Sequence, residues 1–313
     1  MIGYVLRRMI QAAIVALVVS IVLFIVLHAL PGGLVRAQLG MHASRNSVAQ
    51  LTAQEGLNRP LPVQFLTWLW NALQGNLGFS YKLNQTVGSL LAEYVPRTLL
   101  LAGSSLLIAV AIAIPLGLVQ GRRRNKLDDH AITASMLIFY SMPSFLLGVV
   151  LIVVLNLWLA VLPSTASNFG GSLSTDFLDL VLPVLTLALG NVSYFSRYMR
   201  NATIENLLED YVRTARAKGN STRRVLVRHV LRNSMSSTVT MIGLSLPFVL
   251  SGALIVEELF NFPGVGLLFW NASQDRDYPV LLGVVLVVTM ATVVGNLLAD
   301  IGYAVLDPRV RYK

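Results

Sequence analysis

The apolar stretch Thr98-LLLAGSSLLIAVAIAIPLGLV-Gln120 contains no acidic or basic residue. A helix needs roughly 20 mostly apolar residues to cross the hydrocarbon core of a bilayer, and this stretch meets that length. Comparable stretches occur elsewhere, so the sequence predicts six transmembrane helices, over residues 9–30, 98–120, 132–159, 177–195, 239–255 and 279–303. We therefore expect an all-α membrane protein with six transmembrane helices.

The composition of the whole chain agrees with this class. Of its 313 residues, 55% are hydrophobic and only 12% are charged, whereas soluble domains carry about 25% charged residues. The chain has no cysteine, which excludes a disulfide-stapled domain, an iron–sulfur cluster and a zinc ribbon. Because the four histidines are scattered, we expect no histidine-based metal site, and we also expect no cofactor. They are His28, His42, His130 and His229.

The net charge of +9 is interpreted as a result of membrane topology rather than of nucleic-acid binding, because Lys and Arg concentrate in cytoplasmic loops. Eighteen of the 24 basic residues lie near the two ends, in the loop after the second span, or between the fourth and fifth spans. This pattern predicts that both termini are cytoplasmic. The first stretch is longer than the apolar core of a signal peptide and no cleavage site follows it, so we expect it to remain as a span.

Three parts are expected along the chain. Residues 1–95 hold the first span and a polar extracytoplasmic segment, residues 96–305 hold five spans with a cytoplasmic segment at about 196–235, and residues 306–313 form a cytoplasmic tail. Apolar residues recur at helical spacing in the extracytoplasmic segment, at Val63, Leu66, Leu69, Trp70 and Leu73. This helix is either a docking surface for an external partner or a cap that packs on the bundle.

The predicted spans lack the residues that would energise transport. No Asp, Glu, Lys or Arg lies in the middle of a span, which weakens the case for an ion-coupled carrier. No lysine follows a glycine as in a phosphate-binding loop, so any nucleotide chemistry belongs to another chain. Four consecutive spans carry an interior proline, which suits kinked helices around a path, although membrane helices also tolerate proline routinely. These prolines are Pro115, Pro143, Pro183 and Pro247.

The segment between the fourth and fifth spans has the pattern of a helix, a break and a second helix. Acidic residues come early in the first helix and basic residues come late, as the helix dipole favours: Glu205, Glu209 and Asp210, then Arg216 and Lys218. Gly219 suits the left-handed residue after a helix, and Ser221 or Thr222 can cap the next one. The second helix repeats a basic residue every four positions, at Arg224, Arg228 and Arg232. Such a pair is either a lever for a soluble partner or an amphipathic helix held by anionic lipid.

The stretch Asp210-YVRTARAK-Gly219 resembles the cytoplasmic signature loop of ABC importer membrane subunits of the dipeptide/oligopeptide/nickel family. Arg213 stands where the general importer motif has glutamate, and Gly33-Leu34 replaces the usual Asp-Pro after Pro31-Gly32. Further stretches resemble the family in the same order along the chain: 4–8, 28–32, 75–78, 141–145, 182–187, 257–264, 276–279 and 306–309. The resemblance therefore covers nearly the whole chain.

The resemblance implies the type I ABC importer transmembrane fold and no catalytic activity of the chain's own. It also implies several partners besides the lipid bilayer: a second, similar permease subunit that completes a heterodimer, two cytoplasmic ATPase subunits, and an extracytoplasmic solute-binding protein. By the same resemblance, residues 209–218 form the coupling helix that sits in a groove of one ATPase. The expected coupling residues are Arg213, Thr214, Ala215, Arg216 and Gly219.

The resemblance also implies a location and a cargo. The location is the cytoplasmic membrane of a bacterium or archaeon. Di- and oligopeptides are the commonest cargo of the family, with nickel chelates, glutathione or another small solute as alternatives. The residues alone leave two other classes of protein open, an ion-coupled secondary carrier and a membrane scaffold that transports nothing.

Overall fold

The computed structural model describes residues 2–29, 35, 44–54, 56–166 and 169–306. The chain divides into two compact units. The first unit consists of Met1–Thr98 and Pro263–Val293, and the second consists of Leu99–Phe262 and Val294–Lys313. Each unit is described by itself below.

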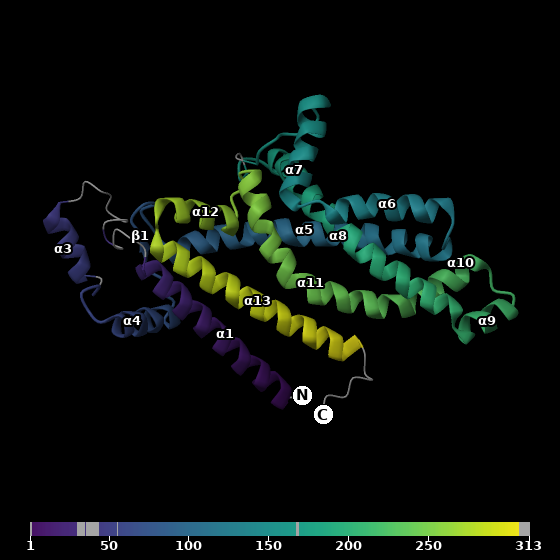
Figure 1. Ribbon diagram of the computed structural model, residues 1–313, viewed down its shortest axis with the longest axis horizontal. Coiled ribbons are helices and arrows are strands. Elements are labelled where there is room, and N and C mark those ends of the chain that lie inside the picture. The colour runs from purple at the N-terminus through teal and green to yellow at the C-terminus, as the bar shows by residue number, and fades with distance from the viewer. Residues whose placement is uncertain (1, 30–34, 36–43, 55, 167–168, 307–313) are drawn as a thin grey trace. The chain divides into compact units, whose positions relative to one another are not determined.

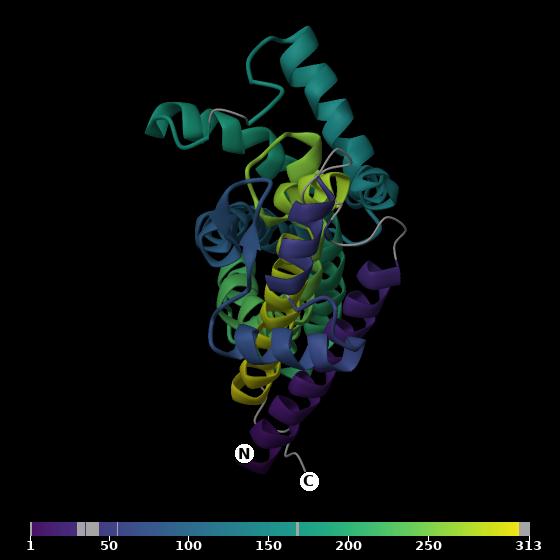
Figure 2. The same cartoon turned by 90° about the vertical axis from the view of Figure 1, so that its left-hand side faces the viewer.

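The first unit begins with α1 (Ile2–Ala29), α3 (Arg45–Gln54) and α4 (Leu61–Leu73). A short antiparallel hairpin follows, in which β1 (Phe79–Ser80) pairs with β2 (Gln85–Thr86). The start of α5 (Val87–Arg122), α12 (Val265–Asp275) and the start of α13 (Tyr278–Leu306) complete the unit. Figure 1 shows α1 beside the first part of α13, and Figure 2 shows α4 lying crosswise to α1.

The core of the first unit joins segments that are far apart in the sequence. Its buried side chains come from α1, α5, α12 and α13: Phe24, Leu27, Val87, Leu90, Leu91, Val265, Leu268, Ala272, Tyr278, Val280, Leu281, Leu282 and Val284. Phe65 and Trp68 of α4 pack against this core. The apolar face predicted for this helix points elsewhere, because Leu66, Trp70 and Leu73 are 63%, 64% and 74% exposed. The helix itself is confirmed, whereas the face that packs is the one carrying Phe65 and Trp68.

A buried hydrogen bond ties the hairpin to the loop before α13. The Ser80 hydroxyl donates to the Asp277 carboxylate, and the two residues are 0% and 2% exposed. The same hydroxyl oxygen accepts from the backbone N–H of Leu83 at 3.0 Å. Burial raises the pKa of Asp277, while the hydrogen bond from Ser80 opposes that rise. The folded chain therefore binds a proton at Asp277 more readily than the unfolded chain does.

We expect Ser80→Ala to destabilise the first unit by roughly 1–3 kcal/mol at neutral pH, since a buried carboxylate loses its hydroxyl donor. A carboxyl group whose pKa is raised on folding stabilises the fold below its unfolded pKa, and this contribution is lost as the pH rises through the folded value. Acidification protonates Asp277. It should therefore reduce the difference in the free energy of unfolding between Ser80→Ala and the unsubstituted chain. Thermal unfolding at several pH values measures this difference, with the exposed Ser47→Ala as control. If the loss of stability in Ser80→Ala does not change with pH, the hydrogen bond from Ser80 to a buried Asp277 carboxylate is not its cause.

The second unit contains the rest of α5 and a run of further helices. In chain order these are α6 (Leu127–Ser141), α7 (Ser144–Ile152), the π-helical segment η1 (Val153–Trp158), α8 (Leu173–Leu208), α9 (Asp210–Ala217), α10 (Thr222–Val225), the π-helical segment η2 (Leu226–Val230) and α11 (Leu231–Leu259). Helix α8 is central, because it contacts α6, α7 and α11. The segment that contains α9 and α10 thus follows directly from this central helix.

Two glycines of α5 allow a close approach to α8. A Cβ atom added at Gly117 would lie 2.6 Å from the Cβ of Met199 and 2.7 Å from the backbone oxygen of Ser196. At Gly121 the added atom would lie 2.6 Å from the Cβ of Thr203. Gly117 and Gly121 form a Gly-x-x-x-Gly pattern, which permits close helix packing in membranes. Any larger residue at Gly117 would force the two backbones apart.

Among the described residues, four helices are long and apolar enough to cross a membrane: Met9–Ala29 of α1, Val87–Arg122, Leu173–Leu208, and Tyr278–Leu297 of α13. They agree with the first, second, fourth and sixth predicted spans. Only 18% of the apolar window in α1 and 39% of that in α8 is buried within the chain, which leaves apolar surface for lipid. The fifth predicted span lies in α11, where many side chains fall outside the described residues. The count of six therefore stays a prediction.

The third predicted span, 132–159, is divided into two helices rather than being one continuous helix. α6 and the α7–η1 run meet at an angle of 107°. The break falls at Met142, which is extended, and at Pro143, which precedes α7. Proline lacks the N–H of a helical hydrogen bond and disfavours the helical conformation of the residue before it. By contrast, α8 continues through Pro183.

Candidate functional site

The segment between α8 and α11 begins with a sharp turn between α8 and α9. Glu209 is extended, with ψ of 148°, so it ends α8 and precedes the first residue of α9. The Tyr211 hydroxyl donates to the Asn206 side-chain oxygen at 2.5 Å, and the Asn206 amide donates to the Ala202 carbonyl at 2.8 Å. These bonds fasten the start of α9 to the last turns of α8. The helix predicted at 209–218 is confirmed as Asp210–Ala217, but Glu205 belongs to α8 and not to this helix.

The end of α9 is fixed by backbone geometry. Gly219 has φ of +76°, as predicted for a left-handed residue. Its N–H donates to the Arg216 carbonyl at 2.9 Å, and the Asn220 N–H donates to the Ala215 carbonyl at 3.3 Å. This pair of bonds is a Schellman motif, which satisfies carbonyls that the helix leaves free. The Asn220 side-chain amide donates to the same Ala215 carbonyl at 3.0 Å, which strengthens the cap.

Helix α9 has a buried face and an exposed face. Val212 and Ala215 are 0% and 6% exposed and pack against the buried side chains of the next helical run. Those side chains are Val225, Leu226 and Val230. The opposite face of α9 and its end are exposed: Arg213, Thr214, Arg216, Ala217, Lys218 and Gly219. The exposed surface of α9 is therefore polar and basic, and the buried face of the helix packs on an apolar layer.

The structure divides the five predicted coupling residues between these faces. Arg213, Thr214, Arg216 and Gly219 are exposed, whereas Ala215 lies on the buried face and supports the helix from behind. Sequence reasoning missed Ala217 and Lys218, which are exposed as well. Their spacing of four residues from Arg213 and Thr214 is the signal that could have found them, since residues four apart share a helix face.

The second helical run leads from this site into α11 without a loop. Ser221 caps it by accepting from the Arg224 backbone N–H at 3.5 Å. α10, η2 and α11 then follow one another with no intervening residue. The predicted basic stripe is exposed along this run, at Arg224, Arg228 and Arg232. The segment predicted as a helix, a break and a helix is confirmed, and its second part extends into a predicted span.

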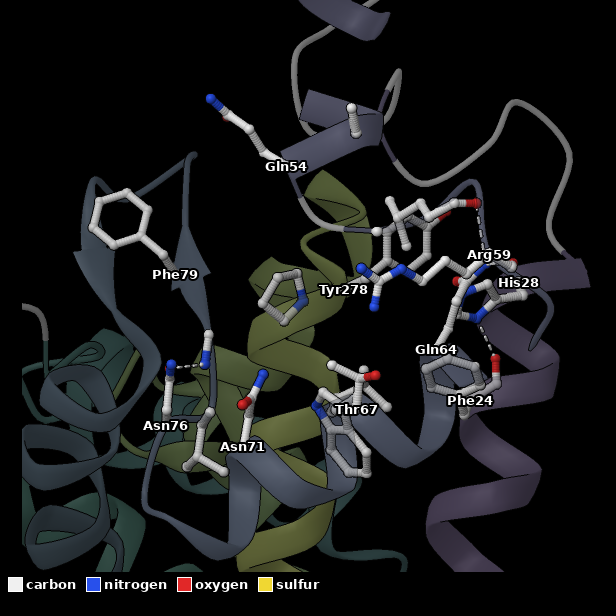
Figure 3. Close-up of a pocket in the computed structure, with 18 residues that line it drawn as sticks. Phe24, His28, Gln54, Arg59, Gln64, Thr67, Asn71, Asn76, Phe79 and Tyr278 are labelled. Carbon is white, nitrogen blue, oxygen red and sulfur yellow. Dashed lines mark hydrogen bonds between the residues drawn. The ribbon is translucent and has the colours of Figure 1, made fainter. Parts of the chain in front are cut away.

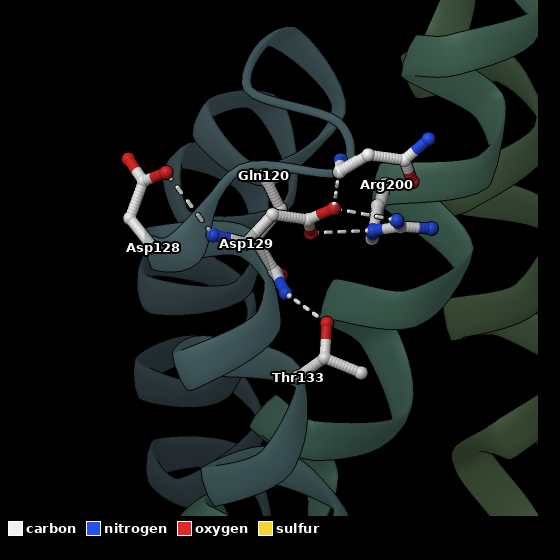
Figure 4. Close-up of polar contacts among 6 residues, drawn as sticks. Gln120, Asp128, Asp129, Thr133 and Arg200 are labelled. Atoms are coloured by element: carbon white, nitrogen blue, oxygen red, sulfur yellow. Dashed lines mark hydrogen bonds and ion pairs between the residues drawn. The ribbon is translucent and has the colours of Figure 1, made fainter.

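An ion pair between Arg200 of α8 and the buried Asp129 of α6 links these two helices (Figure 4). The Arg200 guanidinium donates to both oxygens of Asp129, at 2.8 Å and 2.7 Å, and the backbone N–H of Asn125 donates to one of them at 2.9 Å. Asp129 is 1% exposed at its side chain and Arg200 is 23% exposed. The pair holds the first turn of α6 against α8. Nearby, Gln120 of α5 donates to Thr133 of α6 at 3.2 Å.

No group of three or more His, Asp or Glu residues that could hold a metal ion occurs in the parts of the chain that the structure describes.

Family models account for almost the whole chain. Residues 113–312 match the model described as "Binding-protein-dependent transport system inner membrane component". Residues 1–102 match its N-terminal counterpart. A Brucella ovis protein named as a peptide permease is 39% identical over 99% of both chains. The oligopeptide transport system permease protein AppB of Bacillus subtilis is 36% identical over the full length of both. The glutathione transport system permease protein GsiC of Salmonella typhimurium is 34% identical, also over the full length of both.

A solved structure supports the fold. The inward-facing MetNI methionine ABC transporter contains a chain that matches 68% of this protein and 96% of its own length, with a TM-score of 0.52 and 17% identity. That match supports the type I ABC importer transmembrane fold expected from the signature stretch. With its apolar helices, the chain is a multi-pass membrane protein. It belongs to the family of inner membrane components of binding-protein-dependent transport systems, the non-catalytic permease subunits of ABC importers.

Proposed function

We propose that this chain forms half of a translocation path for short peptides and that α9 couples this path to ATP hydrolysis by another subunit. The family works with ATPase and substrate-binding subunits. In our proposal the chain pairs with a second, similar permease subunit, two ATPases bind at the cytoplasmic side, and a solute-binding protein delivers cargo at the other side. The observation that best supports this proposal is that α9 exposes a polar face while its opposite face packs on an apolar layer.

The contacts of α9 support its role as the coupling helix. Its exposed residues Arg213, Thr214 and Arg216 can contact a groove of an ATPase, with Gly219 turning the chain at the end of the helix. Its buried residues touch η2, which continues as α11. A displacement of α9 therefore reaches α11 through side-chain contacts and continuous helix. A partner shifts the balance between two states only as far as it binds them with different affinities.

The names of the relatives favour peptides as cargo. They include a peptide permease, an oligopeptide permease and a glutathione permease, and glutathione is itself a small peptide. A nickel chelate or another small solute is the alternative. The family relationship favours the importer over an ion-coupled carrier and over a scaffold.

The membrane arrangement belongs to the same proposal. We place the chain in the cytoplasmic membrane of a bacterium or archaeon with both termini inside, since the basic residues of 196–235 and of the loop after α5 then face the cytoplasm. Residues 1–95 would supply the first helix and the extracytoplasmic segment, and 96–305 the five-helix transport domain. Of the predicted tail 306–313, all but its first residue lies outside the described residues.

Purification from native membranes in mild detergent, followed by reconstitution in liposomes, tests the proposal. We expect a second permease and ATPase subunits to co-purify, and we expect uptake of tri-alanine that requires ATP and the solute-binding protein. Uptake should survive an ionophore. Uptake by the chain alone, or uptake that stops with the ionophore and not with ATP depletion, would overturn the proposal.

A further inference from the structure

A cavity of 440 Å³ lies in the first unit, among residues expected on the extracytoplasmic side (Figure 3). Its walls come from the end of α1, the α3–α4 region, the residues before and within β1, and the start of α13. Cavities of about 300–1,000 Å³ are typical of small-molecule sites. Figure 3 shows Arg59, Thr67, Asn71 and Tyr278 around the same space.

Hydrogen bonds hold one wall of this cavity in a fixed arrangement. The Gln64 amide nitrogen donates to the backbone carbonyls of Leu57 at 3.0 Å and Arg59 at 2.7 Å, which fixes the orientation of the amide. The Gln64 oxygen then lies 3.1 Å from His28 Nε2, and His28 Nδ1 lies 2.7 Å from the Phe24 carbonyl. Both ring nitrogens of His28 thus face acceptors, so contacts on two sides hold the ring in place.

Aromatic rings stiffen the same wall. The ring centroids of Phe24 and Phe65 are 5.4 Å apart, and those of Phe65 and Trp68 are 5.9 Å apart. Such packing keeps a site open in one shape instead of letting it collapse. The indole N–H of Trp68 is buried and has no hydrogen-bond partner among the residues that the structure describes. The wall therefore offers apolar surface together with an unused donor.

The described lining of the cavity contains the cationic side chain of Arg59 and no carboxylate. Arg59 is exposed and forms no ion pair within the described part of the chain. Asn76 uses its side-chain oxygen to accept from the Gly78 N–H at 3.1 Å, which leaves its amide N–H groups available. Of the described residues that line the cavity, none is Asp or Glu. The lining therefore favours an anion over a cation.

We propose that this cavity binds the carboxylate end of a short peptide, with Arg59 as the main contact. A guanidinium pairs with a carboxylate through two parallel hydrogen bonds, which gives both strength and orientation. The amide groups of Asn71 and Asn76 match peptide N–H and C=O groups, and the rings of Phe24 and Tyr278 provide apolar surface for a peptide side chain. The mixture of amides and rings fits a peptide better than an inorganic anion. This inference rests on the proposed function, since it assigns a binding site to the proposed cargo.

Binding of tri-alanine to the intact transporter in lipid nanodiscs, measured by calorimetry without ATP or solute-binding protein, tests the inference. We expect the C-terminal amide of tri-alanine to bind at least about tenfold more weakly than the free acid, a factor that corresponds to one charge-assisted hydrogen bond. Arg59→Gln should weaken binding of the free acid by a similar factor, and Arg59→Lys should retain part of it. Arg45→Gln is the matched control, because Arg45 is exposed in the same unit and does not line the cavity.

Two results would overturn the site: equal binding of acid and amide, or unchanged binding in Arg59→Gln. Uptake measured on the same preparation separates the two proposals. If ATP-dependent uptake occurs but Arg59→Gln binds normally, the cavity assignment fails and the proposed function stands. If the acid is preferred and Arg59→Gln abolishes that preference while no ATP-dependent uptake occurs, the cavity stands as a carboxylate site and the proposed function fails.

Discussion

Gly219→Val in the reconstituted transporter is expected to lower peptide-stimulated ATP hydrolysis by about tenfold or more while the chain still inserts into the membrane. A β-branched residue in the left-handed region at φ of +76° is strained by roughly 1–2 kcal/mol, and tenfold corresponds to about 1.4 kcal/mol. Relief of the strain would break the bonds from Gly219 to Arg216 and from Asn220 to Ala215, and would displace the exposed face of α9. ATP hydrolysis with and without tri-alanine and binding protein measures the effect.

A matched variant separates backbone strain from crowding. No atom lies within 4 Å of a Cβ atom added at Gly219, so space does not limit the substitution. Asparagine adopts the left-handed conformation several-fold more readily than most residues. Gly219→Asn should therefore retain most of the stimulation that Gly219→Val loses. If Gly219→Val hydrolyses ATP and transports tri-alanine at the unsubstituted rate, α9 is not the coupling helix.

Arg200→Gln is expected to destabilise the second unit by roughly 3–5 kcal/mol, because it removes one partner of a buried ion pair and leaves the other charge uncompensated. Asp129 is 1% exposed at its side chain and depends on Arg200 for two of its hydrogen bonds. The 23% exposure of Arg200 places the expected value toward the lower end of that range. The unfolding temperature of the purified chain in detergent measures the loss.

Two controls test whether the pair itself carries the effect. Asp129→Asn combined with Arg200→Gln should be more stable than Arg200→Gln alone, because no charge is then left unpaired. Arg123→Gln should change the unfolding temperature little, since the ion pair of Arg123 with Asp128 lies at the surface. An unfolding temperature of Arg200→Gln equal to that of the unsubstituted chain would show that Asp129 does not depend on this partner.

α9 and the helical run after it were predictable because their signals are local. Gly219 and the charges at the ends of α9 act within a few residues of themselves, so the sequence is enough to locate the break and the helix before it. Ser221 was one of two candidate caps, and the structure selects it. Likewise, a long apolar stretch forms a helix wherever the rest of the chain lies, which explains the agreement at four predicted spans.

The features that the sequence did not reveal depend on contacts between distant segments. Asp129 and Arg200 are 71 positions apart. Each is a charged residue near the end of a predicted span, and neither indicates by itself that the other is its partner. Gly117 and Gly121 are close in the sequence, but the helix that packs against them, α8, begins more than 50 residues later. Ala215 was assigned to the ATPase groove by resemblance, whereas the helical run that covers it begins after the turn at Gly219.

The absence of a loop between α10 and α11 has a consequence for protein engineering. Loops absorb insertions, but each residue added to a helix rotates everything beyond it by about 100°. One residue inserted within Thr222–Val230 would therefore turn all of α11 about its axis relative to α9. Chimeras that exchange this segment with a relative must therefore keep the same number of residues, even where the amino-acid sequence changes.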